Sequence, residues 1–296
     1  MAKVDRAGER TTGPLKLKPK APTKTADLVF PVEEPKRDLK NLIVSDEVAN
    51  QIQSLISKIE NYDLLYNQFG LREIDSTGGR TVINLYGLPG TGKSFAAEAI
   101  AKEMGKKVIK VNYADIESKY VGETPKNIKL LFKEARDTDA VLIFDEADSI
   151  LGRRLDSVTK STDHAVNLTK SVMLLELDNF EGITIFTTNF GKNYDPAFLR
   201  RIIGNIEFSL PEKEARRKIL EKLIPAKLPV ALSAADWDEI LANTDGFSGG
   251  DLLNVVVYAS SHAVERDGAK CKVGLNDFND AIELIKKSKQ ELAQQK

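Results

Sequence analysis

One stretch constrains this chain more than any other, a glycine-rich loop that separates a short apolar strand from a helix. Residues 81–86 read TVINLY, a run of β-branched and aromatic residues that is typical of a buried strand. The next eight residues, 87–94, read GLPGTGKS and match every fixed position of the pattern G-x-x-x-x-G-K-[ST]. Alanine-rich sequence that favours a helix follows. This order of strand, loop and helix predicts a phosphate-binding loop and not a glycine turn that binds nothing.

The residue types in this loop suit the binding of phosphates. Glycines allow backbone conformations in which consecutive N–H groups point inward at phosphate oxygens, and the following helix adds the positive end of its dipole. We expect Lys93 to reach the β- and γ-phosphates and the Ser94 hydroxyl to ligate Mg²⁺. The predicted nucleotide-binding residues of the loop are Gly87, Pro89, Gly90, Thr91, Gly92, Lys93 and Ser94.

A pair of carboxylates follows a second apolar strand. Residues 141–144 read VLIF and lead directly into Asp145 and Glu146. Because ligands bind at the carboxyl ends of strands in open α/β sheets, we expect Asp145 to hold Mg²⁺ and Glu146 to polarise the attacking water. The alternative is a helix N-terminus that carries acids only to suit its dipole. The phosphate-binding loop upstream favours the catalytic interpretation.

Composition excludes several classes of protein. The chain has 296 residues, a formal net charge of −1 and 42% hydrophobic residues, which suits one or two domains with a sizeable core. No apolar run approaches the roughly 20 residues that cross a bilayer, and the N-terminus does not resemble a signal peptide. Cys271 is the single cysteine, so neither a disulfide within the chain nor a thiolate zinc cluster is expected. We therefore expect a cytoplasmic protein without a membrane span. The near-neutral net charge gives no electrostatic reason to expect a nucleic-acid partner.

Periodicity divides the chain into four segments. Residues 1–40 are basic and proline-rich, which predicts a disordered arm or a tether that captures a partner. Residues 41–211 alternate strands with helices and predict a parallel sheet covered by helices on both faces. The expected strands are 81–86, 107–112, 140–145, 183–188 and 205–210. Residues 212–286 predict a helical domain, and residues 287–296 a C-terminal tail.

The order of these motifs resembles that of the AAA+ ATPases, and more narrowly the AAA family proper, which includes katanin, spastin and the proteasomal ATPases. Residues 87–94 are similar to Walker A and residues 142–146 to Walker B. TTN at 187–189 resembles sensor 1, DPAFLRR at 195–201 the second region of homology, and GFSGGDL at 246–252 the lid motif. The resemblance covers roughly residues 38–286 and implies an α/β P-loop NTPase of the ASCE type with a C-terminal all-α lid domain.

The resemblance also implies roles for residues outside the two Walker motifs. Asn189 would hydrogen-bond the attacking water and the γ-phosphate, and Arg200 or Arg201 would reach a neighbouring subunit's γ-phosphate as an arginine finger. The family usually reads LRPGRFDR where this chain reads LRRIIGN, so the choice between the two arginines stays open and a second finger is expected to be absent. Further residues implied to contact the nucleotide are Ile43, Gly249 and Gly250.

A last motif bears on what hydrolysis would drive. KYVGE at 119–123 resembles the family's first pore loop, in which Lys119, Tyr120 and Val121 would line the channel of a ring and the aromatic ring would grip a polypeptide. The resemblance implies a hexameric, ATP-hydrolysing motor that remodels, disassembles or unfolds a protein partner, possibly through an adaptor. Two alternatives stay open. They are a nucleic-acid-handling ATPase, which the basic arm would support, and a scaffold ATPase switched by ATP without threading.

The narrower resemblance concerns the source of the chain. DHAVN at 163–167, the shortened FLRR sequence and the compact entry at 43–47 are similar to stand-alone bacterial AAA ATPases found alongside contractile injection or defence machinery. They suggest a bacterial or phage protein.

Overall fold

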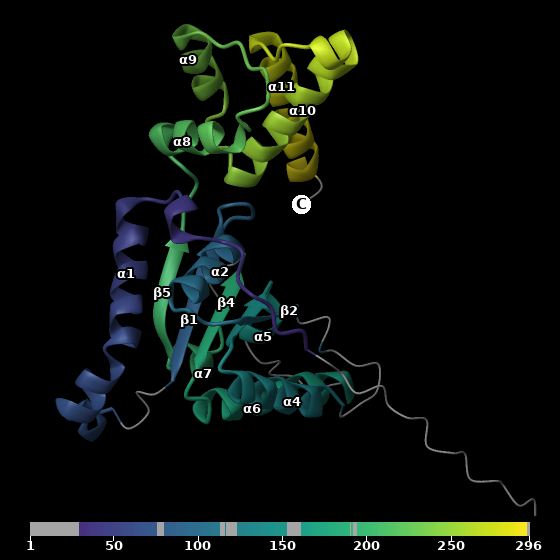
Figure 1. Ribbon diagram of the computed structural model, residues 1–296. Coiled ribbons are helices and arrows are strands. Elements are labelled where there is room, and N and C mark those ends of the chain that lie inside the picture. Colours follow the sequence, from purple (N-terminus) through teal and green to yellow (C-terminus); the bar gives the residue numbers. More distant parts are fainter. Residues whose placement is uncertain are drawn as a thin grey trace, which may run out of the picture.

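A parallel sheet with helices on both faces carries a separate helical lid beyond the carboxyl ends of its strands (Figure 1). The computed structural model describes residues 30–75, 80–112, 116, 123–152, 161–189, 191 and 194–294. The strands are β1 (Thr81–Gly87), β2 (Val108–Asn112), β3 (Val141–Asp145), β4 (Ile183–Thr188) and β5 (Ile202–Phe208). They lie in the order β2-β3-β4-β1-β5, and every neighbouring pair is parallel. The predicted fold class is therefore confirmed.

The three inner strands β1, β3 and β4 are buried on both faces, which explains why they are apolar almost throughout. On one face, β1 and β3 contribute Ile83, Leu85 and Ile143 to a core with α1 (Asp46–Glu60) and α2 (Lys93–Glu103). The other face packs against α4 (Glu123–Thr138), α6 (Ser161–Asp178) and the short α7 (Pro196–Leu199). The other short helices that the structure describes in this domain are η1 (Leu39–Asn41), η2 (Asp63–Gln68), η3 (Leu71–Glu73) and α5 (Asp148–Leu151).

One strand begins earlier than its sequence pattern predicted. The expected strand was 205–210, whereas β5 covers Ile202–Phe208, so the residues around Gly204 belong to it. Leu55 of α1 covers this glycine, and a Cβ there would lie 2.5 Å from the leucine side chain. A glycine usually weakens a strand, so the sequence pattern did not indicate the start of β5. In the fold, this glycine allows the Leu55 side chain to pack closely against β5.

The lid consists of α8 (Lys213–Leu223), α9 (Ala234–Asn243), α10 (Gly249–Asp267), η4 (Gly268–Lys270) and α11 (Leu275–Gln294). Its core is a cluster of its own, with Leu220, Leu252 and Phe278 fully buried. The last helix continues to Gln294 and passes the boundary expected at residue 286, because its sequence contains no glycine or proline that would end it. Residues 287–294 thus belong to the lid's last helix.

The N-terminal segment 30–40 lies against the sheet domain. Phe30 is buried in the core of the face covered by α4 and α6. Glu33 pairs with Val108 through two backbone hydrogen bonds of 2.8 and 2.9 Å, so this segment covers the edge strand β2. The arm expected at residues 1–40 is therefore packed from Phe30 onward, and residues 1–29 lie outside the described part of the chain. No helix in the described ranges is long and apolar enough to cross a membrane.

Candidate active site

The glycine-rich loop joins the end of β1, which lies between β4 and β5, to the start of α2. Gly87 has a φ of 139° and Gly90 a φ of 76°, a region that side chains other than glycine rarely adopt. A Cβ at Gly87 would lie 2.2 Å from the Phe208 carbonyl oxygen, and one at Gly90 would lie 2.6 Å from the Ser248 hydroxyl. Glycine is required at both positions because the loop passes directly between β5 and the lid.

Lys93 is buried beneath this loop and fixed by three acceptors. Its Nζ donates to the carbonyl oxygens of Gly87 (2.8 Å) and Leu88 (2.9 Å) and to Oδ1 of Asn189 (3.0 Å). Burial lowers the pKa of the Lys93 ammonium, although the carboxylates of Asp145 and Asp148 oppose this shift. The ammonium thus lies between the loop and the end of β4, where it can meet a bound phosphate.

Asp145 lies at the end of β3, and two hydroxyls converge on it. Its Oδ1 accepts a hydrogen bond from Ser94 Oγ at 2.8 Å and a second one from Thr187 Oγ1. A hydroxyl and a carboxylate oxygen are the hard oxygen ligands that Mg²⁺ prefers, and this pair is near the lysine that would meet phosphate. The donor set of Ser94 and Asp145 fits a magnesium ion.

Glu146 follows Asp145 in a backbone conformation that is uncommon for a glutamate. Its φ is 52°, and its N–H donates to Thr187 Oγ1 at 3.3 Å. Non-glycine residues in this region often occur at functional sites, where the surrounding structure imposes the conformation. The exposed Glu146 lines the same cavity of about 320 Å³ as Lys93, Ser94 and Asn189.

Asp148 positions Asn189, and sequence reasoning missed this contact. The Asn189 backbone N–H donates to Asp148 Oδ1 at 3.1 Å, while its side-chain oxygen accepts from Lys93. Thr187 was also assigned no role of its own, although it contacts both Asp145 and Glu146. In the sequence, Asp148 is distinguished only by its place in DEAD at 145–148, directly after the apolar strand. Asn189 lies too far along the chain for the contact to be inferred from spacing.

The two candidate arginines have different environments. Arg201 donates from Nε to Asp178 Oδ1 (2.8 Å) and from Nη2 to Asp178 Oδ2 (2.5 Å), and its Nη1 bonds the Ala197 carbonyl oxygen (2.6 Å). Arg200 caps the C-terminus of α7, is exposed, and makes no side-chain hydrogen bond or ion pair with another described residue. Neither arginine lines the phosphate cavity of its own chain.

A larger cavity of about 700 Å³ extends from the loop between the N-terminal segment and the lid. Ile43, Thr91, Gly249 and Gly250 all line it. The lid reaches the loop directly, because the Gly250 N–H donates to the Gly90 carbonyl oxygen at 3.0 Å. Lys119, Tyr120 and Val121 lie outside the described residues.

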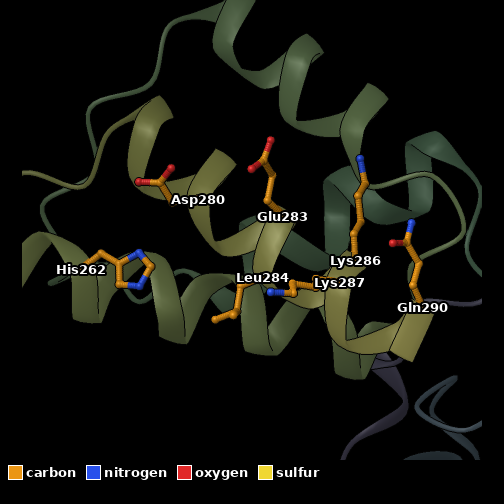
Figure 2. A pocket seen from close by; sticks show the side chains of 7 residues that line it. All are labelled: His262, Asp280, Glu283, Leu284, Lys286, Lys287 and Gln290. Atoms are coloured by element: carbon orange, nitrogen blue, oxygen red, sulfur yellow. The ribbon is translucent and has the colours of Figure 1, made fainter. Parts of the chain in front are cut away.

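A separate hollow of about 530 Å³ lies on the lid between α10 and α11 (Figure 2). Its charged side chains point in different directions and do not converge on one point, as Asp280, Glu283 and Lys287 show in Figure 2. No group of three or more His, Cys, Asp or Glu residues among the described residues is placed to hold a metal ion. Among the described residues, this hollow therefore offers no converging set of groups comparable to the one at the glycine-rich loop.

Comparisons with known proteins agree with this geometry. Residues 83–210 match the model of the ATPase family associated with various cellular activities (AAA), and residues 234–280 match the AAA+ lid domain. The chain is similar to a proteasome-activating nucleotidase of Methanosarcina mazei, with 34% identity over 88% of this chain and 64% of the relative. It is also similar to a probable 26S proteasome regulatory subunit 10B of Caenorhabditis elegans, with 30% identity over 78% of this chain and 64% of the relative.

Solved structures share the fold. The AAA domain of FIGL-1 in complex with ADP superposes with a TM-score of 0.71 at 20% identity, covering 88% of this chain and 87% of that one. The chain spans 64% of the length of each of the two curated relatives, so it corresponds to part of them. Because both domains match in the expected order and the fold agrees, the chain belongs to the AAA family of AAA+ ATPases.

Proposed function

We propose that this chain binds ATP with Mg²⁺ and hydrolyses it, and that a ring of its copies uses the energy to remodel a protein partner. One observation carries the proposal. The ends of β1, β3 and β4 bring a buried lysine, two carboxylates and an amide into one cavity, as phosphoryl transfer requires. The residues of this set are Lys93, Ser94, Asp145, Glu146 and Asn189.

Each of these residues would have a distinct role in hydrolysis. Loop N–H groups and Lys93 would hold the β- and γ-phosphates by electrostatic attraction. Ser94 and Asp145 would hold Mg²⁺, which supplies neutralisation of phosphate charge when bound. Glu146 would accept a proton from the attacking water. Asn189, held by Asp148 through its backbone, would orient that water against the γ-phosphate.

A neighbouring subunit is proposed to complete the site. Because no arginine lines the phosphate cavity within the described chain, the positive charge expected opposite the γ-phosphate must come from elsewhere. Arg200 suits this role better than Arg201, because its side chain is exposed and has no hydrogen-bond or ion-pair partner among the described residues. Arg201 is occupied by Asp178 and would fix the segment from which Arg200 projects.

The protein partner is proposed from two sources. The relatives described above are a proteasome-activating nucleotidase and a probable 26S proteasome regulatory subunit, and the names of both connect them to the proteasome. The sequence at 119–123 is similar to an aromatic pore loop, so we propose that Tyr120 grips polypeptide in the channel of a hexamer. Contact between Gly250 of the lid and Gly90 of the loop offers a route by which hydrolysis moves the lid.

A substrate trap tests the proposal. Glu146→Gln should bind ATP, fail to hydrolyse it and retain its partner, whereas the double variant Glu146→Gln, Tyr120→Ala should release that partner. A protein that co-purifies with the single variant and is lost from the double variant would support threading. Retention by both variants would favour the scaffold ATPase, and salt-sensitive retention of nucleic acid in place of protein would favour the nucleic-acid-handling alternative.

A further inference from the structure

We infer that Arg37 is an additional nucleotide-binding residue, which contacts the part of the nucleotide between its base and its terminal phosphates, and that Glu98 positions it. The inference rests on the nucleotide binding proposed above. It concerns the N-terminal segment, in which sequence reasoning identified no site residue.

Glu98 fixes the backbone of this segment to the helix that follows the phosphate-binding loop. Its side chain in α2 is only 7% exposed. Its Oε1 accepts hydrogen bonds from the backbone N–H groups of Lys36 and, at 3.2 Å, Arg37, while Oε2 accepts from Lys110 Nζ at 2.6 Å. Burial raises the pKa of Glu98, but these hydrogen bonds outweigh burial and lower it, so the carboxylate stays ionised. Residues 36 and 37 of the N-terminal segment are thus fixed to α2, the helix that follows the loop.

This attachment places the Arg37 side chain at the nucleotide cavity. Its Cζ lies 5.1 Å from the centroid of the Phe95 ring, within the range of a cation–π contact. Phe95 directly follows Ser94 and lines both the phosphate cavity and the larger cavity beneath the lid. Arg37 lines only the larger one. The guanidinium therefore lies outside the compartment for the terminal phosphates, so the ribose and α-phosphate of a bound nucleotide are the groups it would meet.

The charge of Arg37 is available to a ligand. Its guanidinium is exposed and has no carboxylate partner among the described residues. The side-chain contact that it does make is with the Phe95 ring. A guanidinium offers donors in a planar arrangement that matches phosphate oxygens. Stacking on a ring next to the phosphate-binding loop limits its conformations, which lowers the entropic cost of binding.

The position of Arg37 predicts a specific pattern of effects. ATP and ADP share the ribose and α-phosphate, so loss of Arg37 should weaken both nucleotides by the same factor. Removal of a charge-assisted hydrogen bond predicts a loss of about tenfold in affinity. The rate at saturating ATP should not change, because the contact is equal in the ground state and the transition state.

The experiment compares full-length Arg37→Ala with Arg37→Lys and with Arg217→Ala as a matched control. The Cζ of Arg217 also lies over an aromatic ring, 3.8 Å from the centroid of Trp237, but Arg217 belongs to the lid and does not line this cavity. Calorimetry would measure the Kd of ADP and of a non-hydrolysable ATP analogue, and steady-state assays would give KM and kcat. We expect an equal loss for both nucleotides with Arg37→Ala, a smaller loss with Arg37→Lys, a raised KM with constant kcat, and no change with Arg217→Ala.

The positioning role of Glu98 is tested by asking whether the effect of Glu98→Ala on nucleotide affinity requires Arg37. Glu98→Ala should weaken nucleotide binding, Glu98→Gln should restore most of the loss because its amide oxygen still accepts the backbone N–H groups, and Glu98→Ala should add nothing to Arg37→Ala. Thermal unfolding of each variant identifies any that misfold. If both variants fold normally and their losses of nucleotide affinity add up in the double variant, Glu98 does not act through Arg37. That result would overturn the positioning role of Glu98.

Two outcomes would overturn the assignment of Arg37. They are unchanged binding of both nucleotides by Arg37→Ala, and a loss confined to the ATP analogue, which would place the contact at the γ-phosphate. Wild-type protein that binds neither nucleotide would instead overturn the proposed function together with this inference. Normal wild-type binding with an unaffected variant overturns the inference alone.

Discussion

The phosphate cavity and the arginine segment at the end of α7 differ in how their charged groups are held. In the cavity, the Lys93 ammonium has three acceptors within the chain, and Asp145 accepts from two hydroxyls. At the end of α7, Arg201 is equally well held by Asp178 and Ala197, but Arg200 projects into solvent. The charged groups of the cavity are held by their own chain, whereas the end of α7 presents Arg200, a cation without a partner in the described part of the chain.

This difference separates groups that act within a subunit from groups that act on another. Electrostatic catalysis gains most from charges and dipoles already oriented before the reaction, and the contacts of Lys93 and Asp145 provide that orientation. A residue that must reach a neighbour's phosphate cannot be occupied by partners of its own. This contrast supports the proposal that Arg200 acts on the neighbouring subunit's phosphate and that Arg201 fixes the segment from which Arg200 projects.

The largest effect should come from the cavity itself. Glu146→Gln removes the proton acceptor for the attacking water while leaving Lys93 and Ser94 in place, so hydrolysis should fall by about 10²- to 10⁴-fold. ATP binding should persist within a few-fold. Phosphate release and nucleotide binding measured on the same preparation check this, and the account is wrong about Glu146 if hydrolysis survives.

The next effect separates the two arginines. Arg200→Ala should lower hydrolysis by the assembled protein by about 10³-fold, the loss typical of an arginine finger, with unchanged thermal stability. Arg201→Ala removes an ion pair to Asp178 that is partly exposed, so it should cost at most about 1 kcal/mol of stability. Parallel rate and unfolding measurements distinguish the variants. A severe rate loss at Arg201 with none at Arg200 would reverse the roles.

The smallest effect concerns the lid, where Asp251 caps α10 next to the loop. Burial raises the pKa of Asp251, but hydrogen bonds from Lys289 and Ser248 outweigh burial and lower it below the ordinary value of 3.8. Because the folded-state pKa is depressed, the stabilisation is complete above that ordinary value and is lost as the pH falls through the folded-state pKa. Asp251→Asn should therefore cost about 1 kcal/mol at pH 7 and progressively less in acid.

Urea unfolding followed by the fluorescence of Trp237, the single tryptophan of the chain, reports on the lid that contains it. Asp236→Asn serves as the control, because Asp236 completes the same type of capping box on α9 without a lysine partner. A smaller cost is expected there. A deficit of Asp251→Asn that stays constant from pH 7 into acid would contradict the proposed ionic contribution.

Local sequence patterns predicted most of the fold and the centre of the candidate site. The loop at 87–94 and the run that ends in Asp145 and Glu146 are each a continuous stretch of sequence. Neighbouring residues therefore predict the strand, the turn and the ligands together. The five strands were predicted for the same reason, except for the start of β5, where Gly204 makes room for Leu55 of α1.

The contacts that sequence could not predict join residues far apart in the chain. Asp148 holds the backbone of Asn189, Asp178 holds Arg201, and Glu98 holds the backbone of Arg37. Each is an ionisable side chain whose surroundings are set by tertiary packing, and a carboxylate on a helix is more often simply solvated. Only the fold distinguishes such a residue from a surface acid.

The dependence of hydrolysis on a neighbour's arginine is tested most directly by mixing two inactive variants. Glu146→Gln lacks the proton acceptor but carries Arg200, whereas Arg200→Ala keeps an intact cavity but lacks the cation. In a randomly mixed head-to-tail ring, roughly a quarter of the interfaces pair an intact cavity with an intact Arg200. We predict that the mixture recovers ATP hydrolysis up to about that fraction of the wild-type rate. A mixture as inactive as its components, with mixed assembly verified, would contradict the account.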